Sequence, residues 1–530
     1  MSMHQPCNPF SGQDFPWLLA TQAKAYADKP LLIWEPFDQP AQTYTYQAFD
    51  QAVGRVAAAM ENLGVGSGDR VLIHLENSPE FLLAWCACAE LGAIAVTTNT
   101  RSSAEEMKYF VTHSRCSVAI TQPSLVDRLA LVRANLRWLV CTEHDAGQPA
   151  ALPAGVLPFA ELLLPEPASQ RRRFAPDPLR PMYVQYTSGT TSRPKGVVLT
   201  HGNALWSGRV NAFHQDLRSD DVHLAVMPLF HTNALGYGFM TSLWTGSTLV
   251  LQPRFSASRF WDVALRNRCT WHSTLPFFMR ALLARPLPEQ HFFRLWGTGM
   301  CDPALAQPFG IKTIGWWGMT ETVSHPIIAM TGLPNTPMSI GRAATTYQIC
   351  VVDDDGQPTA IGGSGHLRVL GMRGVSLFKE YLDDPVATAA SFDDQGWFLS
   401  GDRVTLLEDG SIKFADRDKD MLKVGGENVA SSEIERVLLG VAGVTEVAVV
   451  ARHHAMLTEV PFAFVALSGE IGAERHGEFI DQLLARCRHE LADFKVPVGI
   501  RIVDDFPRVT LEKISKADLR KQLAAEAADE

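Results

Sequence analysis

Helical and strand-like segments alternate along the first 335 residues, and this alternation restricts the fold more than any other feature. Residues 44–65 carry apolar side chains at helical spacing and stop at a glycine, whereas residues 69–75 (DRVLIHL) are a short apolar run typical of a buried strand. Residues 78–96 predict a helix, a turn and a strand, and residues 117–122 and 136–143 predict two further strands. Such alternation predicts a parallel sheet with crossover helices.

The pattern changes further along the chain. Residues 147–180 are rich in proline and alanine, and we expect them to form a surface connection. Residues 340–415 contain short strand-like runs with Asp-Gly turns, which are typical of an antiparallel sheet. The last roughly 110 residues combine helical and strand-like runs in a length that suits a separate α+β domain.

Composition and charge exclude several classes of protein. The 530 residues have an ordinary hydrophobic content of 46% and a net charge of −10, which disfavours nucleic-acid binding. The nine cysteines show no metal-ligand spacing, and their odd number argues against a disulfide framework. The first residues lack a signal-peptide core, and no apolar run is long enough to span a membrane. We expect a soluble, cytoplasmic protein without nucleic-acid or integral-membrane partners, and a homodimer stays open.

Residues 187–196 (TSGTTSRPKG) follow a predicted strand and combine hydroxyls, a glycine and a lysine. Backbone N–H groups and hydroxyls in a tight loop after a strand form a nest for phosphate oxygens, and Lys195 adds a positive charge. The spacing differs from that of a Walker loop. A polar surface turn has the same composition, so this stretch alone leaves both interpretations open.

Three further stretches carry candidate site residues. In residues 315–322 (GWWGMTET), a carboxylate next to a threonine suits Mg²⁺ beside nucleotide phosphates, although a core aromatic pair before a helix cap would look the same. Residues 400–435 contain Asp402 and Arg417, which could hold ribose hydroxyls or lie on the surface. Residues 506–520 contain Lys513, which alone would be an ordinary solvated lysine.

Together these stretches resemble the adenylate-forming superfamily of acyl-CoA synthetases, luciferases and peptide-synthetase adenylation domains. The resemblance extends from about residue 20 to residue 522. YTSGTTSRPKG resembles the phosphate loop of the family, WGMTE its Y-G-M-T-E stretch, and GWFLSGD its G-W-x-x-T-G-D stretch. DRDKDMLKVGGENV resembles the hinge between domains, and PRVTLEKI resembles the P-R-T-x-x-G-K-I ending.

The resemblance implies an α/β fold and a two-step ligase reaction. A large N-terminal AMP-binding domain (1–418) would contain several subdomains with parallel-rich sheets and a small barrel-like β region. A small mobile α+β domain (419–530) would follow. The acid would attack ATP to give acyl-AMP and pyrophosphate, and after rotation of the small domain a thiol would take the acyl group. ATP, Mg²⁺ and coenzyme A (CoA) are the implied cofactor and co-substrates.

The resemblance also assigns roles to residues around the nucleotide. A phosphate-binding loop would consist of Thr187, Ser188, Gly189, Thr190, Thr191 and Lys195. Thr320 would contact the α-phosphate, Glu321 would bind Mg²⁺, and Trp317 would stack on adenine. Asp402 and Arg417 would hold the ribose hydroxyls.

Other roles concern the acyl group and the rotation of the small domain. Lys513 would bridge the carboxylate and the α-phosphate in the first step only. Lys419 would be the hinge. Lys423 would take part in cofactor binding, and Gly425 and Gly426 would lie beside the pantetheine tunnel. His231, in PLFHTN, would line the acyl pocket as a catalytic residue, unless it is a buried core histidine.

The sequence departs from the family pattern at four places. Ser192 replaces a loop glycine, and Trp317 replaces the usual tyrosine. Glu512 replaces the glycine before Lys513, where a carboxylate could repel phosphate or pair with that lysine. Residues 296–303 (WGTGMCDP) do not match the G-G-A-P-L adenine segment.

The acid and its acceptor are constrained less tightly. The pocket segment lacks the aspartate of amino-acid-activating domains and no carrier domain follows, which favours CoA. The loop and VMPLFH resemble the carnitine/crotonobetaine-CoA ligase branch. Trp296, Trp316 and Trp317 could cage a quaternary ammonium, but we favour a hydrophobic pocket for a medium-chain, aryl or steroid-derived acid. Loading of a carrier protein and a catalytically inactive nucleotide-binding protein are the alternatives.

Overall fold

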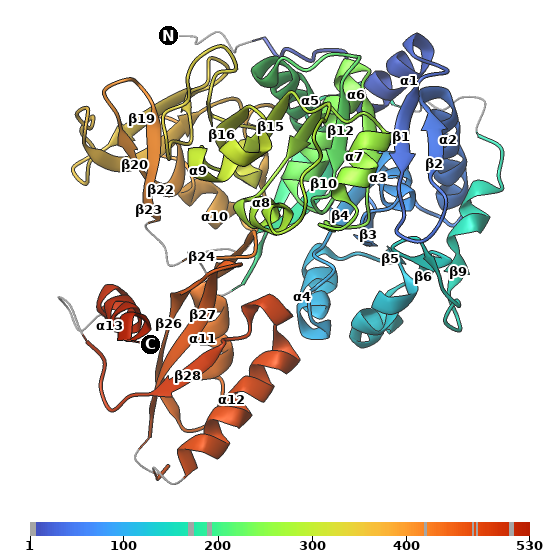
Figure 1. The fold of residues 1–530 in the computed structure, drawn as a ribbon. Helices are drawn as coiled ribbons and strands as arrows, with labels where there is room; N and C mark the ends of the chain where they lie inside the picture. Colours follow the sequence, from blue (N-terminus) through green and yellow to red (C-terminus); the bar gives the residue numbers. More distant parts are fainter. Residues whose placement is uncertain are drawn as a thin grey trace.

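The computed structural model has the expected α/β architecture: parallel-rich sheets, a half-barrel antiparallel sheet and a small α+β C-terminal part (Figure 1). No helix within the described part of the chain is long and apolar enough to cross a membrane. The structure describes residues 7–167, 174–187, 193–417, 421–468, 471–472, 475–507 and 514–529.

The predicted strands of the first 200 residues lie in one sheet, which has eight strands among the described residues. Its central strands pair in parallel, whereas β10 and β11 form an antiparallel hairpin and β11 pairs antiparallel with β21. In spatial order the strands are β21 (Glu380–Tyr381), β11 (Lys195–Thr200), β10 (Pro181–Thr187), β4 (Ile94–Thr97), β3 (Arg70–His74), β5 (Val118–Thr121), β6 (Trp138–Cys141) and β9 (Leu157–Pro158).

Strand β9 corrects one expectation. Residues 147–180 were expected to be a surface connection, but Leu157–Pro158 pairs with β6, and Phe159 and Leu162 after it are buried. Apolar side chains within a proline-rich stretch therefore extend the sheet at its edge.

The second sheet has nine strands in the described ranges and is also mainly parallel. Its antiparallel pairs lie at the two edges, where β2 pairs with β1 and where β17 pairs with β16 and β18. In spatial order the strands are β18 (Arg342–Ala343), β17 (Ile327–Ile328), β16 (Thr313–Trp317), β15 (Leu295–Thr298), β14 (Trp271–Ser273), β12 (Val222–Ala225), β13 (Thr248–Leu251), β1 (Pro30–Trp34) and β2 (Gln42–Thr45).

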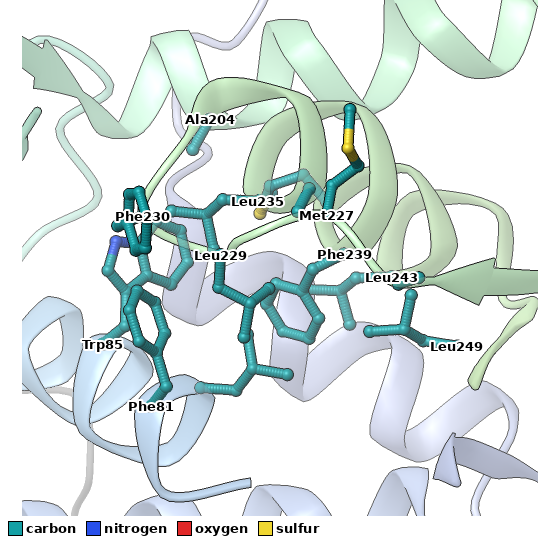
Figure 2. Close-up of a cluster of buried hydrophobic side chains, with 14 of the residues drawn as sticks. Phe81, Trp85, Ala204, Met227, Leu229, Phe230, Leu235, Phe239, Leu243 and Leu249 are labelled. Atoms are coloured by element: carbon teal, nitrogen blue, oxygen red, sulfur yellow. The ribbon is translucent and has the colours of Figure 1, made fainter. Parts of the chain in front are cut away.

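Helices pack between and around these sheets. The helix expected in residues 44–65 begins after the Thr45 cap and ends just before Gly64, and the helix in residues 78–96 ends at Gly92 in the left-handed conformation. Figure 2 shows part of the shared core, where side chains such as Phe81, Trp85 and Phe230 meet. The helices are α1 (Phe15–Ala25), α2 (Tyr46–Asn62), α3 (Pro79–Leu91), α4 (Ala104–Ser114), α5 (His201–Gln215), α6 (Thr241–Thr245), α7 (Phe260–Arg266), α8 (Pro276–Leu283), α9 (Pro303–Ala306) and α10 (Pro385–Ala390).

A four-stranded antiparallel sheet follows in the described chain, as the Asp-Gly turns predicted. It consists of β19 (Gln348–Val352), β20 (Ser364–Leu370), β22 (Phe398–Leu406) and β23 (Ile412–Arg417). Short elements complete this part of the chain: β7 (His144–Asp145), β8 (Gln148–Pro149) and the helical turns Pro123–Asn135, Phe159–Leu163, Gln307–Phe309 and Thr320–Thr322, with a π-helix at Asn233–Met240.

The C-terminal part has a core of its own. Alternate residues of β26 enter two different clusters: Val447 and Val449 pack toward α11 and α12, whereas Ala448 and Val450 pack toward α13. Its elements are β24 (Met421–Val424), β25 (Glu427–Ala430), α11 (Ser431–Leu439), β26 (Val444–His454), β27 (Thr458–Leu467), α12 (His476–Glu490), the turn Asp493–Lys495, β28 (Gly499–Ile502) and α13 (Lys516–Asp529).

Candidate functional site

The candidate nucleotide-binding residues lie where strands end. Thr187 is the last residue of β10 and pairs with Lys195, the first residue of β11. Trp317 is the last residue of β16. Ligands of open α/β sheets bind outside the carboxyl ends of the strands. Thr187 and Trp317 therefore lie at the strand ends where a ligand is expected.

Lys195 and Glu321 are connected through a residue that the sequence did not single out. The ammonium of Lys195 lies 4.6 Å from the ring centroid of Tyr381. The Tyr381 hydroxyl donates to the Glu321 carboxylate over 2.9 Å. Burial and the Glu321 carboxylate raise the pKa of the Tyr381 phenol, so that it stays protonated and remains a donor. Because β21 pairs with β11, Tyr381 is held at this place by backbone pairing.

The turn that carries Thr320 and Glu321 is held by a backbone hydrogen bond and by burial. The backbone N–H of Phe378 donates to the Glu321 carbonyl over 2.8 Å, and the Glu321 side chain is buried. Val323, directly after the turn, has φ of 65°. A β-branched residue with a positive φ is strained, and such strain persists where the surrounding contacts enforce it.

The expected ribose-binding residues also meet. Asp402 on β22 and Arg417 on β23 are direct cross-strand partners in the backbone register. The Trp317 indole N–H donates to the Asp402 carboxylate over 2.7 Å. This contact fixes the Trp317 ring beside Asp402.

His231 is positioned by its chain neighbours. Gln185 on β10 donates to the Phe230 carbonyl over 2.9 Å and accepts from the Thr232 hydroxyl over 2.7 Å. Phe230 itself lies in the buried cluster of Figure 2, beside Trp85. The residues on both sides of His231 are therefore fixed, and the π-helix Asn233–Met240 follows, a form often found at functional sites.

The His231 side chain contacts the C-terminal part. Its Nε2 lies 3.0 Å from a carboxylate oxygen of Glu427 on β25, and the His231 side chain is 42% exposed whereas that of Glu427 is 14% exposed. Burial alone would lower the pKa of the His231 imidazole, but the Glu427 carboxylate outweighs burial and raises it. Burial likewise opposes ionisation of Glu427, yet His231 and nearby cations lower the pKa of its carboxyl. The pair is thus an ion pair that joins the two parts of the chain.

The hairpin formed by β24 and β25 lies next to α8 of the larger part of the chain (Figure 1). Gly425 and Gly426 form its turn with φ of 58° and 94°, which favours glycine. A Cβ on Gly426 would lie 2.6 Å from a methyl group of Leu275, the residue that precedes α8. Lys423 on β24 lies over the Phe414 ring at 5.0 Å. The two glycines allow the turn to approach the larger part of the chain closely.

Several predicted site residues lie outside the described residues. They are Ser188, Gly189, Thr190 and Thr191, the hinge residue Lys419 and the lysine Lys513, together with Ser192 and Glu512. The side chain of Arg417 is likewise not described. Their roles stay predictions.

The three tryptophans expected near the acyl pocket have different surroundings. Trp296 is fully buried, with its ring 4.9 Å from the Phe309 centroid, and belongs to the core. Trp316 stacks on His325 with centroids 4.4 Å apart. Trp317 bonds to Asp402. Each indole ring therefore already has a packing or bonding partner.

Sequence reasoning missed Gln185, Tyr381 and Glu427. Glu427 follows the two glycines directly, so its place next to the site could have been expected from that motif. Gln185 and Tyr381 lie on strands that meet the site only through sheet pairing, and no local pattern marks them.

Comparisons with known proteins agree with this geometry. The AMP-binding enzyme family matches residues 19–382, and the AMP-binding enzyme C-terminal domain matches residues 433–513. A crotonobetaine/carnitine–CoA ligase of Salmonella choleraesuis (strain SC-B67) is 32% identical over 518 residues, which cover 96% of this chain and 99% of that protein.

Two solved structures resemble this chain over nearly its full length. A double mutant of o-succinylbenzoate CoA synthetase from Bacillus subtilis, bound with its product analogue OSB-NCoA, gives a TM-score of 0.80 at 26% identity, covering 96% of this chain and 98% of that one. The anthranilate CoA ligase AuaEII in complex with anthranoyl-AMP gives 0.72 at 25% identity, covering 98% and 99%. By its sequence, its fold and these matches, the chain belongs to the AMP-binding enzymes and is an AMP-forming acyl-CoA synthetase that uses ATP and CoA.

Proposed function

We propose that the protein activates a small carboxylic acid as an acyl-adenylate and then transfers the acyl group to CoA. In the first step a carboxylate oxygen attacks the α-phosphorus of ATP, and pyrophosphate leaves. In the second step the CoA thiol loses its proton and attacks the acyl carbonyl, and AMP leaves. This reaction class is supported by relatives that ligate acids to CoA and that match this chain over nearly their full length.

The first step would take place beside Lys195, Tyr381 and Glu321, which contact one another. Lys195 supplies positive charge near the phosphates, and Thr320 and Lys513 would contact the α-phosphate as its charge develops. Trp317 and Asp402 would hold the nucleoside. Glu321 offers a carboxylate of the type that Mg²⁺ accepts, and nucleotide phosphates would complete its ligands. When bound there, Mg²⁺ would neutralise charge on the phosphates.

The second step is supported by one observation above all: Glu427 from the C-terminal hairpin reaches His231 over 3.0 Å. In this arrangement the Gly425–Gly426 turn lies beside Leu275, where a pantetheine arm could approach the acyl group. We propose a boundary at residues 418 and 419, with Lys419 as the hinge, because the cores on either side are separate.

For the acid, we propose a small molecule with an aromatic or aliphatic tail. Trp296, Trp316 and Trp317 are all engaged with protein groups, which speaks against an open aromatic cage for a cation. A carnitine-like acid is the second candidate, because the curated relatives ligate crotonobetaine or carnitine.

Pyrophosphate release across a panel of acids, with and without CoA, tests the proposal. The panel contains carnitine, crotonobetaine, short and medium fatty acids, benzoates and steroid acids, and the thioester is identified by its mass. Turnover that yields acyl-CoA from one class is expected. Pyrophosphate release without thioester formation would instead favour loading of a carrier protein. The absence of pyrophosphate release with every acid would contradict the proposal.

A further inference from the structure

A lysine is buried where the C-terminal part contacts α4. Lys495 ends the short turn after α12, and only 7% of the residue is exposed. Its ammonium donates to Glu433 in the first turn of α11 over 2.7 Å. It also donates to Glu106 in the first turn of α4 over 2.6 Å. One buried cation therefore joins a carboxylate from each part of the chain.

Neighbouring contacts also join the start of α4 to the C-terminal part. The Ser103 hydroxyl, at the N-terminus of α4, donates to the Glu490 carbonyl at the end of α12 over 2.5 Å. Arg101 donates to Asp493 over 2.8 Å, and its guanidinium lies over the Phe494 ring at 4.6 Å. The chain before and at the start of α4 thus contacts one short segment, residues 490–495, and Lys495 is the buried cation of this contact.

Both sides remain paired if this contact opens. Lys495 and Glu433 belong to the C-terminal part and form a neutral pair by themselves. The other carboxylate oxygen of Glu106 accepts the Ser103 backbone N–H over 2.8 Å in a capping box. Separation therefore leaves Lys495 with a carboxylate and Glu106 with a backbone donor, which lowers the penalty for breaking a buried ion pair. The contact suits a repeated change of arrangement.

The lysine is also linked to the site. Glu433 lies in the first turn of α11, which begins directly after β25, and β25 carries Glu427. The hairpin is therefore held at one end by Glu427 on His231 and at the other by Glu433 on Lys495. Fixing Lys495 to α4 restricts how far Glu427 can move from His231.

We propose that Lys495 is a positioning residue for thioester formation: by joining Glu433 to Glu106 it holds the C-terminal part in the arrangement that brings Glu427 to His231. The proposal rests on the assignment of this arrangement to the second step. Adenylation does not depend on the Glu106 contact, since none of the nucleotide-side residues touches it.

Glu106→Gln is the sharpest test. Glutamine keeps an oxygen for the Ser103 N–H, so the capping box survives, but it presents no carboxylate to Lys495. The Lys495–Glu433 pair stays neutral. Glu105→Gln is the matched control, because Glu105 lies one residue earlier and contacts only the exposed Lys108, at 3.7 Å, in the described structure.

Both half-reactions are measured: pyrophosphate release without CoA, and acyl-CoA formation from supplied acyl-adenylate and CoA. We expect Glu106→Gln to slow acyl transfer about tenfold, with adenylation and the melting temperature close to wild type. Amide hydrogen exchange in residues 490–495 should become faster in this variant but not in Glu105→Gln. Equal slowing of both half-reactions, or no slowing of transfer, would overturn the proposal.

The same experiment separates this proposal from the proposed function. If wild type and Glu105→Gln form acyl-CoA from the adenylate, the function holds and the Glu106→Gln result decides the role of Lys495. If neither protein forms acyl-CoA from any adenylate, the proposed function itself fails.

Discussion

Two regions of the molecule meet the reactants in different ways. The nucleotide region, Lys195, Trp317, Glu321, Tyr381 and Asp402, is joined by contacts that all lie within residues 193–417. The docking region consists of contacts between residues before 418 and residues beyond 420. These contacts include Glu427 with His231, Gly426 with Leu275, and Lys495 with Glu106.

This difference predicts that the two regions serve different half-reactions. The contacts of the nucleotide region all lie before residue 418, so we expect them to persist when the C-terminal part moves. The docking region exists only while the two parts are in contact. Changes in the first should therefore impair adenylation, whereas changes in the second should impair acyl transfer and leave adenylation intact.

The largest effect is expected for Glu321→Gln. This change keeps the shape of the side chain and an oxygen for the Tyr381 hydroxyl but removes the negative charge. Loss of one electrostatic group at a developing charge costs about 10²- to 10³-fold in rate. Pyrophosphate release should fall by that factor, measured against Glu408→Gln, which changes an exposed carboxylate. A decrease of less than about threefold in the rate of pyrophosphate release would show that Glu321 has no catalytic role.

Glu427→Gln should have the next largest effect, and its size should depend on pH. The pKa of His231 is raised, so the ion pair stabilises docking below the ordinary histidine pKa and is lost as pH rises through the raised value. The ratio of wild-type to variant transfer rates should be about tenfold near pH 6 and should decrease as pH rises. A ratio that is constant from pH 6 to 9 would contradict the ion pair.

Gly426→Ala tests the close approach of the hairpin turn. The new methyl group would meet Leu275, and the turn has φ of 94°, so transfer should slow about fivefold. Gly396→Ala is the control: its φ is 85°, but its Cβ would have nothing within 4 Å. Adding Leu275→Ala to Gly426→Ala should restore part of the rate. Equal effects of the two glycine changes would show that backbone strain alone is responsible.

Trp317→Phe should have the smallest effect. It removes the indole N–H that Asp402 accepts but keeps an aromatic face, so the KM for ATP should rise about threefold. Trp138→Phe removes an indole N–H that donates to the distant Leu63 carbonyl, and it should leave this KM unchanged. An effect on acyl transfer from supplied adenylate, with an unchanged KM for ATP, would place Trp317 outside the nucleotide region.

The sequence was informative where local patterns determine structure. The glycine after residues 44–63 and the apolar run of residues 69–75 predicted α2 and β3, and the Asp-Gly turns predicted the antiparallel sheet. Local rules suffice there because a helix end or a tight turn depends on its own residues.

Sequence reasoning could not find the contacts that link distant segments. Tyr381 reaches Glu321 from a two-residue strand, and Lys495 reaches Glu106 from 389 positions away. Trp317 and Asp402 were each singled out, but nothing local indicated that they bond to each other. Trp296 was expected near the pocket and lies in the core, since an aromatic residue beside a motif can face either side of its strand.

The division between the two regions is tested most directly by acyl transfer from supplied acyl-adenylate to CoA, compared in Glu321→Gln and Glu427→Gln. We expect transfer near the wild-type rate in Glu321→Gln and about tenfold slower transfer in Glu427→Gln. Equal slowing in both variants, or slower transfer in Glu321→Gln than in Glu427→Gln, would contradict it.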